Sequence, residues 1–167
     1  WFRDSMEMQP IGTNQFEVDI RRPDTTFYAR SVRSIPQGFV GFKDNSFISN
    51  GGFVSLVSGN TFDVFSELVI KSVDVYSSNL SSTNSVEVQL WDSNNDVIYS
   101  QTFDLGSIGL NRLALDFYVQ PGQNYKLMAA QIIGSGLFRN GPSDFSGQYP
   151  QVLEGLIQIN GVTGNGN

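Results

Sequence analysis

The chain has 167 residues, of which 16 are acidic and 10 basic, so its net charge is −6, and it contains neither histidine nor cysteine. The absence of imidazoles and thiols excludes Ser-His-Asp triads, thiol nucleophiles and the usual structural zinc sites. The basic residues are scattered rather than gathered in a stripe, which argues against a nucleic-acid partner.

Hydrophobic residues make up 40% of the chain and charged residues 16%, a composition typical of a folded domain. No run approaches the roughly 20 apolar residues that cross a bilayer, so we expect no direct membrane insertion. Apolar and polar residues alternate in short runs bounded by Gly, Asn, Asp, Ser and Pro, which predicts an all-β fold. The expected strands cover residues 16–20, 27–32, 53–57, 68–76, 86–91, 97–103, 113–119, 125–129 and 153–159.

The first two expected strands belong to a region, residues 1–34, that is too short to hold a hydrophobic core alone. Pro36 and Gly38 follow it and indicate a boundary. We therefore expect residues 1–34 to be the C-terminal part of one domain and residues 35–162 to form a β-sandwich. Residues 163–167 are polar and Gly-rich, which predicts a flexible linker.

Alternation within the second region assigns the faces of its strands. Positions 113, 115, 117 and 119 carry Leu, Leu, Phe and Val, which places these side chains on the inward face. Near Lys71 and Ser72 the alternation slips, which predicts a β-bulge. Tyr76, Trp91 and Tyr118 fall on the outward side of their strands. If these strands are neighbours, the three rings form an apolar platform on which sugar rings stack.

Residues 92–96 separate two apolar runs and supply side chains that tolerate a positive φ, which predicts a hairpin. Asp92, Asn94 and Asp96 carry alternating side-chain oxygens and are therefore candidate ligands of a structural calcium ion. The run lacks the Gly and the downstream Glu of an EF-hand loop. Equally possible ligands are Asp44, Asn45, Asn50 and Glu154. No other cofactor is expected.

The longest Gly/Ser/Pro-rich stretch, residues 133–150, contains Arg139, Asn140 and Tyr149. Loops on a rigid sandwich are where ligands usually bind, so these three residues are candidate ligand contacts. The guanidinium of Arg139 suits a carboxylate or a sugar hydroxyl. In the alternative interpretation, Arg139 and Tyr149 attach the long loop to the body of the domain.

Two sets of motifs point to known modules. The first set is Trp1-Phe2-Arg3-Asp4-Ser5, Pro10-Ile11-Gly12-Thr13 and Thr25-Thr26-Phe27-Tyr28-Ala29-Arg30. The second includes Trp91-Asp92-Ser93-Asn94-Asn95, Leu113-Ala114-Leu115-Asp116-Phe117, Pro121-Gly122-Gln123-Asn124-Tyr125-Lys126-Leu127 and Gly155-Leu156-Ile157-Gln158-Ile159-Asn160-Gly161. The first set resembles the second half of the Ig-like repeats in large secreted proteins of Bacteroidetes, with Phe2, Asn14 and Phe27 in place of the usual Tyr, Gly and Tyr. The second resembles the jelly-roll module that often follows such repeats.

The resemblance implies a jelly-roll β-sandwich preceded by the C-terminal part of an Ig-like β-sandwich domain, in a protein that is exported by the type IX secretion route and is secreted or held at the cell surface. It also implies a non-catalytic adhesion module of a large multi-domain protein. Surface glycans and neighbouring modules of the same chain are the expected partners. Two alternatives stay open, namely a structural spacer in a surface stalk or filament and an accessory domain of a secreted hydrolase.

We expect no enzyme activity. Catalysis in this chain would have to use two carboxylates, for instance a glycosidase pair made of Glu87 and Asp116. Exposed strand carboxylates in an acidic domain are usually solvated instead, and no other catalytic constellation is visible in the sequence.

Overall fold

The computed structural model describes residues 37–45, 51–78, 83–139 and 148–164. The chain divides into two units, Trp1–Gln37 and Gly38–Asn167. The expected Ig-like fragment, residues 1–34, lies outside the described residues together with its two expected strands.

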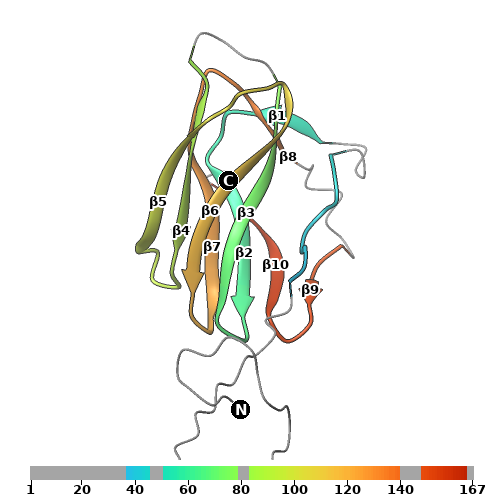
Figure 1. Ribbon diagram of the computed structural model, residues 1–167, viewed down its shortest axis with the longest axis vertical. Helices are drawn as coiled ribbons and strands as arrows, with labels where there is room; N and C mark the ends of the chain where they lie inside the picture. The colour runs from blue at the N-terminus through green and yellow to red at the C-terminus, as the bar shows by residue number, and fades with distance from the viewer. Residues whose placement is uncertain (1–36, 46–50, 79–82, 140–147, 165–167) are drawn as a thin grey trace, which may run out of the picture. The chain divides into compact units, whose positions relative to one another are not determined.

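The described part of the second unit is built from β-strands (Figure 1). Its strands are β1 (Gly52–Val54), β2 (Ser58–Val64), β3 (Leu68–Ser77), β4 (Ser85–Trp91), β5 (Val97–Asp104), β6 (Gly109–Val119), β7 (Gly122–Ile133), β8 (Leu137–Arg139), β9 (Gln151–Leu153) and β10 (Ile157–Gly164). Within the described ranges, no helix has the length and apolar character needed to cross a membrane.

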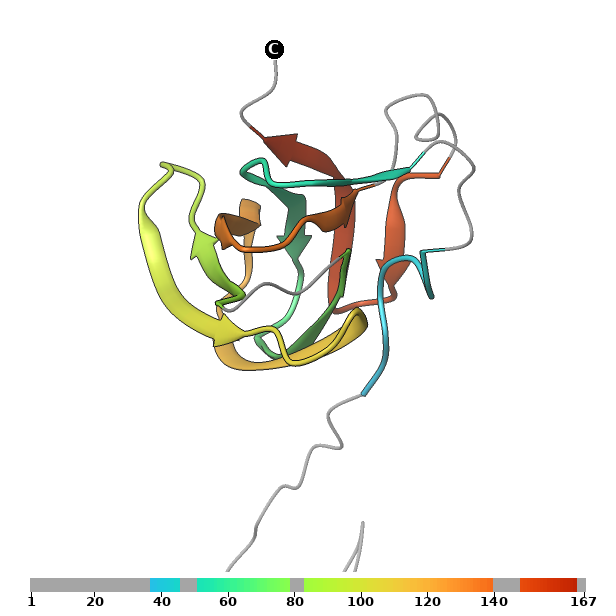
Figure 2. The ribbon, with the colours of Figure 1, turned by 90° about the horizontal axis from the view of Figure 1, so that it is seen from above.

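The strand pairing is that of a jelly roll. Each of the first four strands runs antiparallel to its mirror image among the next four, so that β1 pairs with β8, β2 with β7, β3 with β6 and β4 with β5. A long hairpin that rolls up in this way gives two sheets, here ordered β1-β8-β3-β6 and β5-β4-β7-β2-β10-β9. The strands surround the interior when the unit is seen from above (Figure 2). The predicted all-β sandwich is confirmed for the described part of the second unit.

The last two strands lie beside the roll rather than within it. Strand β10 pairs with β2, and β9 pairs with β10, so both extend the same sheet to six strands. Strand β10 runs to Gly164, and Thr163 and Gly164 pair with Gly59 and Ser58. The strand therefore extends two residues into the segment that was expected to be a linker, residues 163–167.

Inward side chains of the two sheets form one hydrophobic core. In β6 every second residue is buried, and in β4 the same alternation places Val86, Val88 and Leu90 inside. Each such side chain contributes about 1.5–3 kcal/mol when it is fully removed from water. Tyr99 of β5 stacks on Phe117 of β6 with ring centroids 4.8 Å apart, so the two sheets also meet at this edge. The inward face predicted for residues 113–119 is confirmed.

The irregularity predicted near Lys71 and Ser72 is also confirmed. The register of β3 against β6 shifts between Ile70 and Ser72, and Asp116 of β6 has a φ of 53° there. Lys71 and Asp116 form an ion pair of 2.7 Å whose side chains are 77% and 67% exposed. An ion pair this open to water contributes little to stability, so the bulge mainly adjusts which side chains point inward.

Candidate functional site

The outer side of the six-stranded sheet carries an ordered row of polar side chains that ends at an indole. Because Val88 and Leu90 point into the core, Glu87, Gln89 and Trp91 of β4 point outward. The indole Nε1–H of Trp91 donates to Gln89 Oε1 at 2.8 Å, and Gln89 Nε2 donates to Glu87 Oε1 at 2.8 Å. These bonds hold the indole along its own strand.

The row continues onto β5 at its other end. Ser100 Oγ of β5 donates to Glu87 Oε1 at 2.5 Å. The hydrogen bonds from Ser100 and then Gln89 lower the pKa of the Glu87 carboxyl, because they stabilise its charged form. Glu87 is therefore an acceptor at neutral pH, and it fixes the orientation of the Gln89 amide.

Beside this row, Met128 and Gly59 form an apolar area on the outer side of the sheet. Met128 of β7 is paired with Gln89 on one side and with Gly59 of β2 on the other. Its neighbours in the strand, Leu127 and Ala129, pack against the core, so Met128 points outward, yet it is only 4% exposed. Gly59 has no side chain to cover this area, and a Cβ at this position would lie 2.0 Å from the carbonyl oxygen of Leu127.

Lys126 of β7 completes the surroundings of the indole. It pairs with Trp91 on one side and with Thr61 of β2 on the other, and its Nζ donates to Asn95 Oδ1 in the β4–β5 turn. We call this surface the Trp91 face. It is formed by Glu87, Gln89 and Trp91 of β4, Lys126 and Met128 of β7, and Gly59 and Thr61 of β2. An aromatic ring flanked by amide, hydroxyl and ammonium groups suits a polar ring-shaped ligand such as a sugar.

The other two rings of the expected platform lie on the other sheet. Tyr76 belongs to β3 and Tyr118 to β6, where they pair with Leu110 and Val69. The outward sides of the two sheets of a sandwich face in opposite directions, so neither tyrosine can join Trp91 in one surface. The three-ring platform is therefore wrong, because alternation reveals the face of a strand but not the sheet to which the strand belongs.

Tyr118 instead takes part in a local polar contact. Its hydroxyl donates to Glu67 Oε2 at 2.8 Å, and this bond to a carboxylate raises the pKa of the Tyr118 hydroxyl. Gln120 Nε2 donates to the same hydroxyl at 2.8 Å. Tyr118 is 44% exposed and lies on the other sheet from Trp91, so it offers an exposed aromatic ring for comparison with Trp91.

Arg139, at the end of β8, and Tyr149, which follows later in the sequence, line the same cleft. This cleft lies between the two sheets and has a volume of about 220 Å³. Tyr149 packs edge-on against Phe42 with ring centroids 5.9 Å apart, and burial raises the pKa of the Tyr149 hydroxyl. We call this cavity between the two sheets the inter-sheet cleft. The third residue predicted with them, Asn140, lies outside the described residues.

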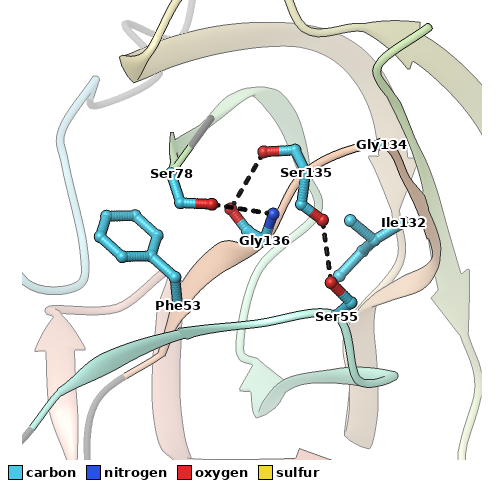
Figure 3. Close-up of a pocket in the computed structure, with 7 residues that line it drawn as sticks. All are labelled: Phe53, Ser55, Ser78, Ile132, Gly134, Ser135 and Gly136. Atoms are coloured by element: carbon cyan, nitrogen blue, oxygen red, sulfur yellow. Dashed lines mark hydrogen bonds between the residues drawn. The ribbon is translucent and has the colours of Figure 1, made fainter. Parts of the chain in front are cut away.

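A second hollow, of about 380 Å³, is surrounded by serines and glycines at the end of β1 and β3 (Figure 3). Ser55 Oγ donates to the carbonyl oxygen of Ser135 at 2.9 Å, and the backbone N–H of Gly136 donates to Ser78 Oγ at 3.1 Å. The hydroxyl of Ser135 donates to the carbonyl oxygen of Gly136 at 3.2 Å. These polar groups satisfy one another, so the hollow is a structural junction that attaches the β7–β8 turn to the preceding strands.

The β4–β5 turn confirms the predicted hairpin and shows how its acidic residue is used. Asp92 Oδ1 accepts hydrogen bonds from the backbone N–H groups of Asn94 and Asp96, both at 2.9 Å. Asn95 has a φ of 70°, a conformation that Asn tolerates well. In the part of the chain that the structure describes, no group of three or more His, Cys, Asp or Glu residues is placed to hold a metal. The calcium site at Asp92, Asn94 and Asp96 stays a prediction.

Glu87 and Asp116 do not form a pair of carboxylates. Glu87 points outward from the six-stranded sheet and Asp116 outward from the four-stranded sheet. Stacked sheets lie about 10 Å apart, and these two side chains point away from each other. They therefore cannot flank one glycosidic bond.

Comparisons with known proteins add no relative: no protein-family model, no curated protein and no solved structure matches the chain.

Proposed function

We propose that this chain is a non-catalytic adhesion module of a large secreted or cell-surface protein and that it binds glycans through the Trp91 face. The observation that carries the proposal is the indole of Trp91, fixed by Gln89 beside an apolar area and a row of polar groups. A ring that is already held in place loses little conformational entropy when a ligand stacks on it. The neighbouring amide and ammonium groups supply hydrogen bonds to sugar hydroxyls.

The shape of the surface supports weak binding at each single site. The Trp91 face is the outer side of a sheet, and of its residues only Gly59 and Met128 also line the inter-sheet cleft. Open platforms with few polar contacts bind with affinities on the order of micromolar to millimolar. Repetition of such a module in a long surface protein raises the overall avidity, which is how an adhesin gains strength. The resemblance of residues 36–162 to jelly-roll modules of surface proteins supports the same role.

A glycan array probed with the full chain tests the proposal. Trp91→Ala should reduce binding to every retained glycan by about tenfold or more, because it removes the stacking surface. Tyr118→Ala is the matched control, since it removes an exposed aromatic ring from the other sheet. Equal loss in both variants, or retained binding in Trp91→Ala, would contradict the proposal. An array with no bound glycan would also contradict it and favour the spacer role.

A further inference from the structure

Three polar side chains face the inter-sheet cleft from different strands. Asn60 of β2 is two residues before buried Phe62, and Gln151 of β9 pairs with Ile159, which packs against the core. Arg139 of β8 is two residues after buried Leu137. Residues two apart in a strand share a face, so all three point between the sheets. Each is partly buried.

None of these three side chains has a partner within the described ranges. Neither the guanidinium of Arg139 nor the amides of Asn60 and Gln151 make a side-chain hydrogen bond or ion pair there. Partial burial removes water from these groups without giving them new hydrogen bonds. The resulting cost in free energy is largest for the charged guanidinium. An arginine in this position is well suited to an anionic group that enters from outside the chain.

The remaining lining is largely apolar, and its acidic residue, Asp74, has its carboxylate paired with Arg112. The apolar residues include Val73 and Val75 of β3, Leu127 of β7, and Ile159 and Val162 of β10. A ligand that satisfies both parts of the cleft combines an apolar body with an anionic head. We propose that the inter-sheet cleft binds a short aliphatic carboxylate, with its carboxylate on Arg139 and its chain between the sheets. A planar carboxylate matches the paired N–H groups of a guanidinium, and the apolar walls strengthen this attraction by excluding water.

The cleft, of about 220 Å³, has room for a short aliphatic carboxylate. Its 220 Å³ corresponds to roughly seven water volumes of about 30 Å³ each. Hexanoate, with about eight non-hydrogen atoms, is of this size. The amides of Asn60 and Gln151 are available to the second carboxylate oxygen or to ordered water. The carboxylate contacts of this site, Arg139, Asn60 and Gln151, are not part of the Trp91 face, although Gly59 and Met128 border both. Either proposal can therefore fail without the other.

Methyl-detected NMR on the full chain, titrated with sodium hexanoate, tests the assignment. Hexanoate should produce saturable shifts of the methyl signals of Val73, Val75 and Ile159. Hexan-1-ol has the same chain without the charge and should bind at least about tenfold more weakly. Shifts confined to other methyl groups, or equal affinity for the alcohol, would overturn the proposal, as would the absence of saturable shifts.

Variants locate the charge that is responsible. Arg139→Gln should weaken hexanoate binding by about tenfold or more, while Arg139→Lys, which keeps the charge but loses the paired donors, should fall between it and the original chain. Lys71→Gln is the matched control, because it removes an exposed cation from the outer side of the four-stranded sheet. If Arg139→Gln fails to fold, the comparison of Arg139→Lys with Lys71→Gln still decides the matter. Unchanged affinity in the folded Arg139 variants overturns the site.

Discussion

The indole Nε1–H of Trp91 donates a 2.8 Å hydrogen bond to Gln89 Oε1, two residues earlier on the same side of β4. The bond fixes the ring from within its own strand, and Glu87 in turn fixes the amide. A surface aromatic without such support would turn between rotamers and would have to be immobilised by each ligand. The positioning of the ring is therefore a property of the sequence Glu87-Val88-Gln89-Leu90-Trp91 and its strand conformation.

Gln89→Ala should loosen the indole without disturbing the fold. We expect glycan affinity to fall about three- to tenfold, because the ring must be ordered on binding, and the free energy of unfolding to change by about 0.5 kcal/mol or less. Relaxation of the indole N–H signal of Trp91 measures the loosening directly. Gln120→Ala, which removes one of the two hydrogen-bond partners of the Tyr118 hydroxyl, is the control and should leave that signal unchanged.

Asp74 makes the stability of the sandwich depend on acid. Arg112 donates to its carboxylate at 2.7 and 2.8 Å, and these bonds hold the pKa of Asp74 below its ordinary value of 3.8. A carboxyl with a lower pKa in the folded state stabilises the protein above its unfolded pKa, and this contribution is lost as the pH falls through the folded pKa. Asp74→Asn should therefore reduce the free energy of unfolding at neutral pH and flatten its decline below pH 3.8.

Urea unfolding at a series of pH values measures this effect. Asp116→Asn is the matched control, because it removes the other ion pair between β3 and β6, whose side chains are 77% and 67% exposed. That variant should follow the original chain closely at every pH, since exposed pairs contribute little. If the two variants lose the same free energy of unfolding, the Arg112–Asp74 pair contributes no more than the exposed Lys71–Asp116 pair, which would contradict the prediction.

Asp92→Ala should destabilise the hairpin between β4 and β5. The substitution leaves the backbone N–H groups of Asn94 and Asp96 without their acceptor, and we expect a loss of about 1–2 kcal/mol in the free energy of unfolding. Ser93→Ala changes an exposed residue of the same turn and should be nearly neutral. Repeating both measurements with calcium and with a chelator checks the predicted ion. A calcium-dependent rise in stability that disappears in Asp92→Ala would assign the ion to this turn.

Gly59→Ala should be among the most damaging small substitutions in the unit. The added Cβ would lie 2.0 Å from the carbonyl oxygen of Leu127, a backbone atom that cannot move aside without breaking the β2–β7 pairing. We expect a loss of about 3 kcal/mol or more, or no soluble folded protein. Gly52→Ala provides the control, because its Cβ would meet nothing within 4 Å. Thermal unfolding measures both variants. A loss of stability in Gly59→Ala alone assigns the effect to the close approach of the Leu127 carbonyl, whereas an equal loss in Gly52→Ala would contradict this explanation.

Local features of this fold could be predicted from the sequence because local rules determine them. The alternation of Leu113, Leu115 and Phe117 defines the inward face of β6, and the polar residues at 92–96 define the hairpin. The slip near Lys71 also appears as a break in alternation. In each case the pattern lies within a single strand or turn, so no knowledge of distant partners is needed.

Features that depend on distant pairing could not be predicted in this way. Trp91 and Tyr118 have the same outward parity, but the jelly roll places their strands in different sheets. Strand β2 was missed because Gly59, Asn60 and Thr61 interrupt any apolar alternation, and with it Asn60 was missed as a residue of the inter-sheet cleft. Such a polar residue at an inward position is recognisable only when Phe62 and Val64 are already known to lie in a strand.

The pairing of β1 with β8 also determines when the module can acquire its structure. Gly52 meets Arg139, so the first strand of the roll has no partner until almost the whole module has been synthesised. Contacts this far apart in the chain make folding slow, because a long loop must close before they form. As the chain leaves the ribosome, β4 can pair with β5 and β3 with β6 at once, but the sheet that holds β1 stays incomplete until β8 has been made. Until then, the aliphatic residues that will line the interior of the module are exposed to chaperones and to aggregation.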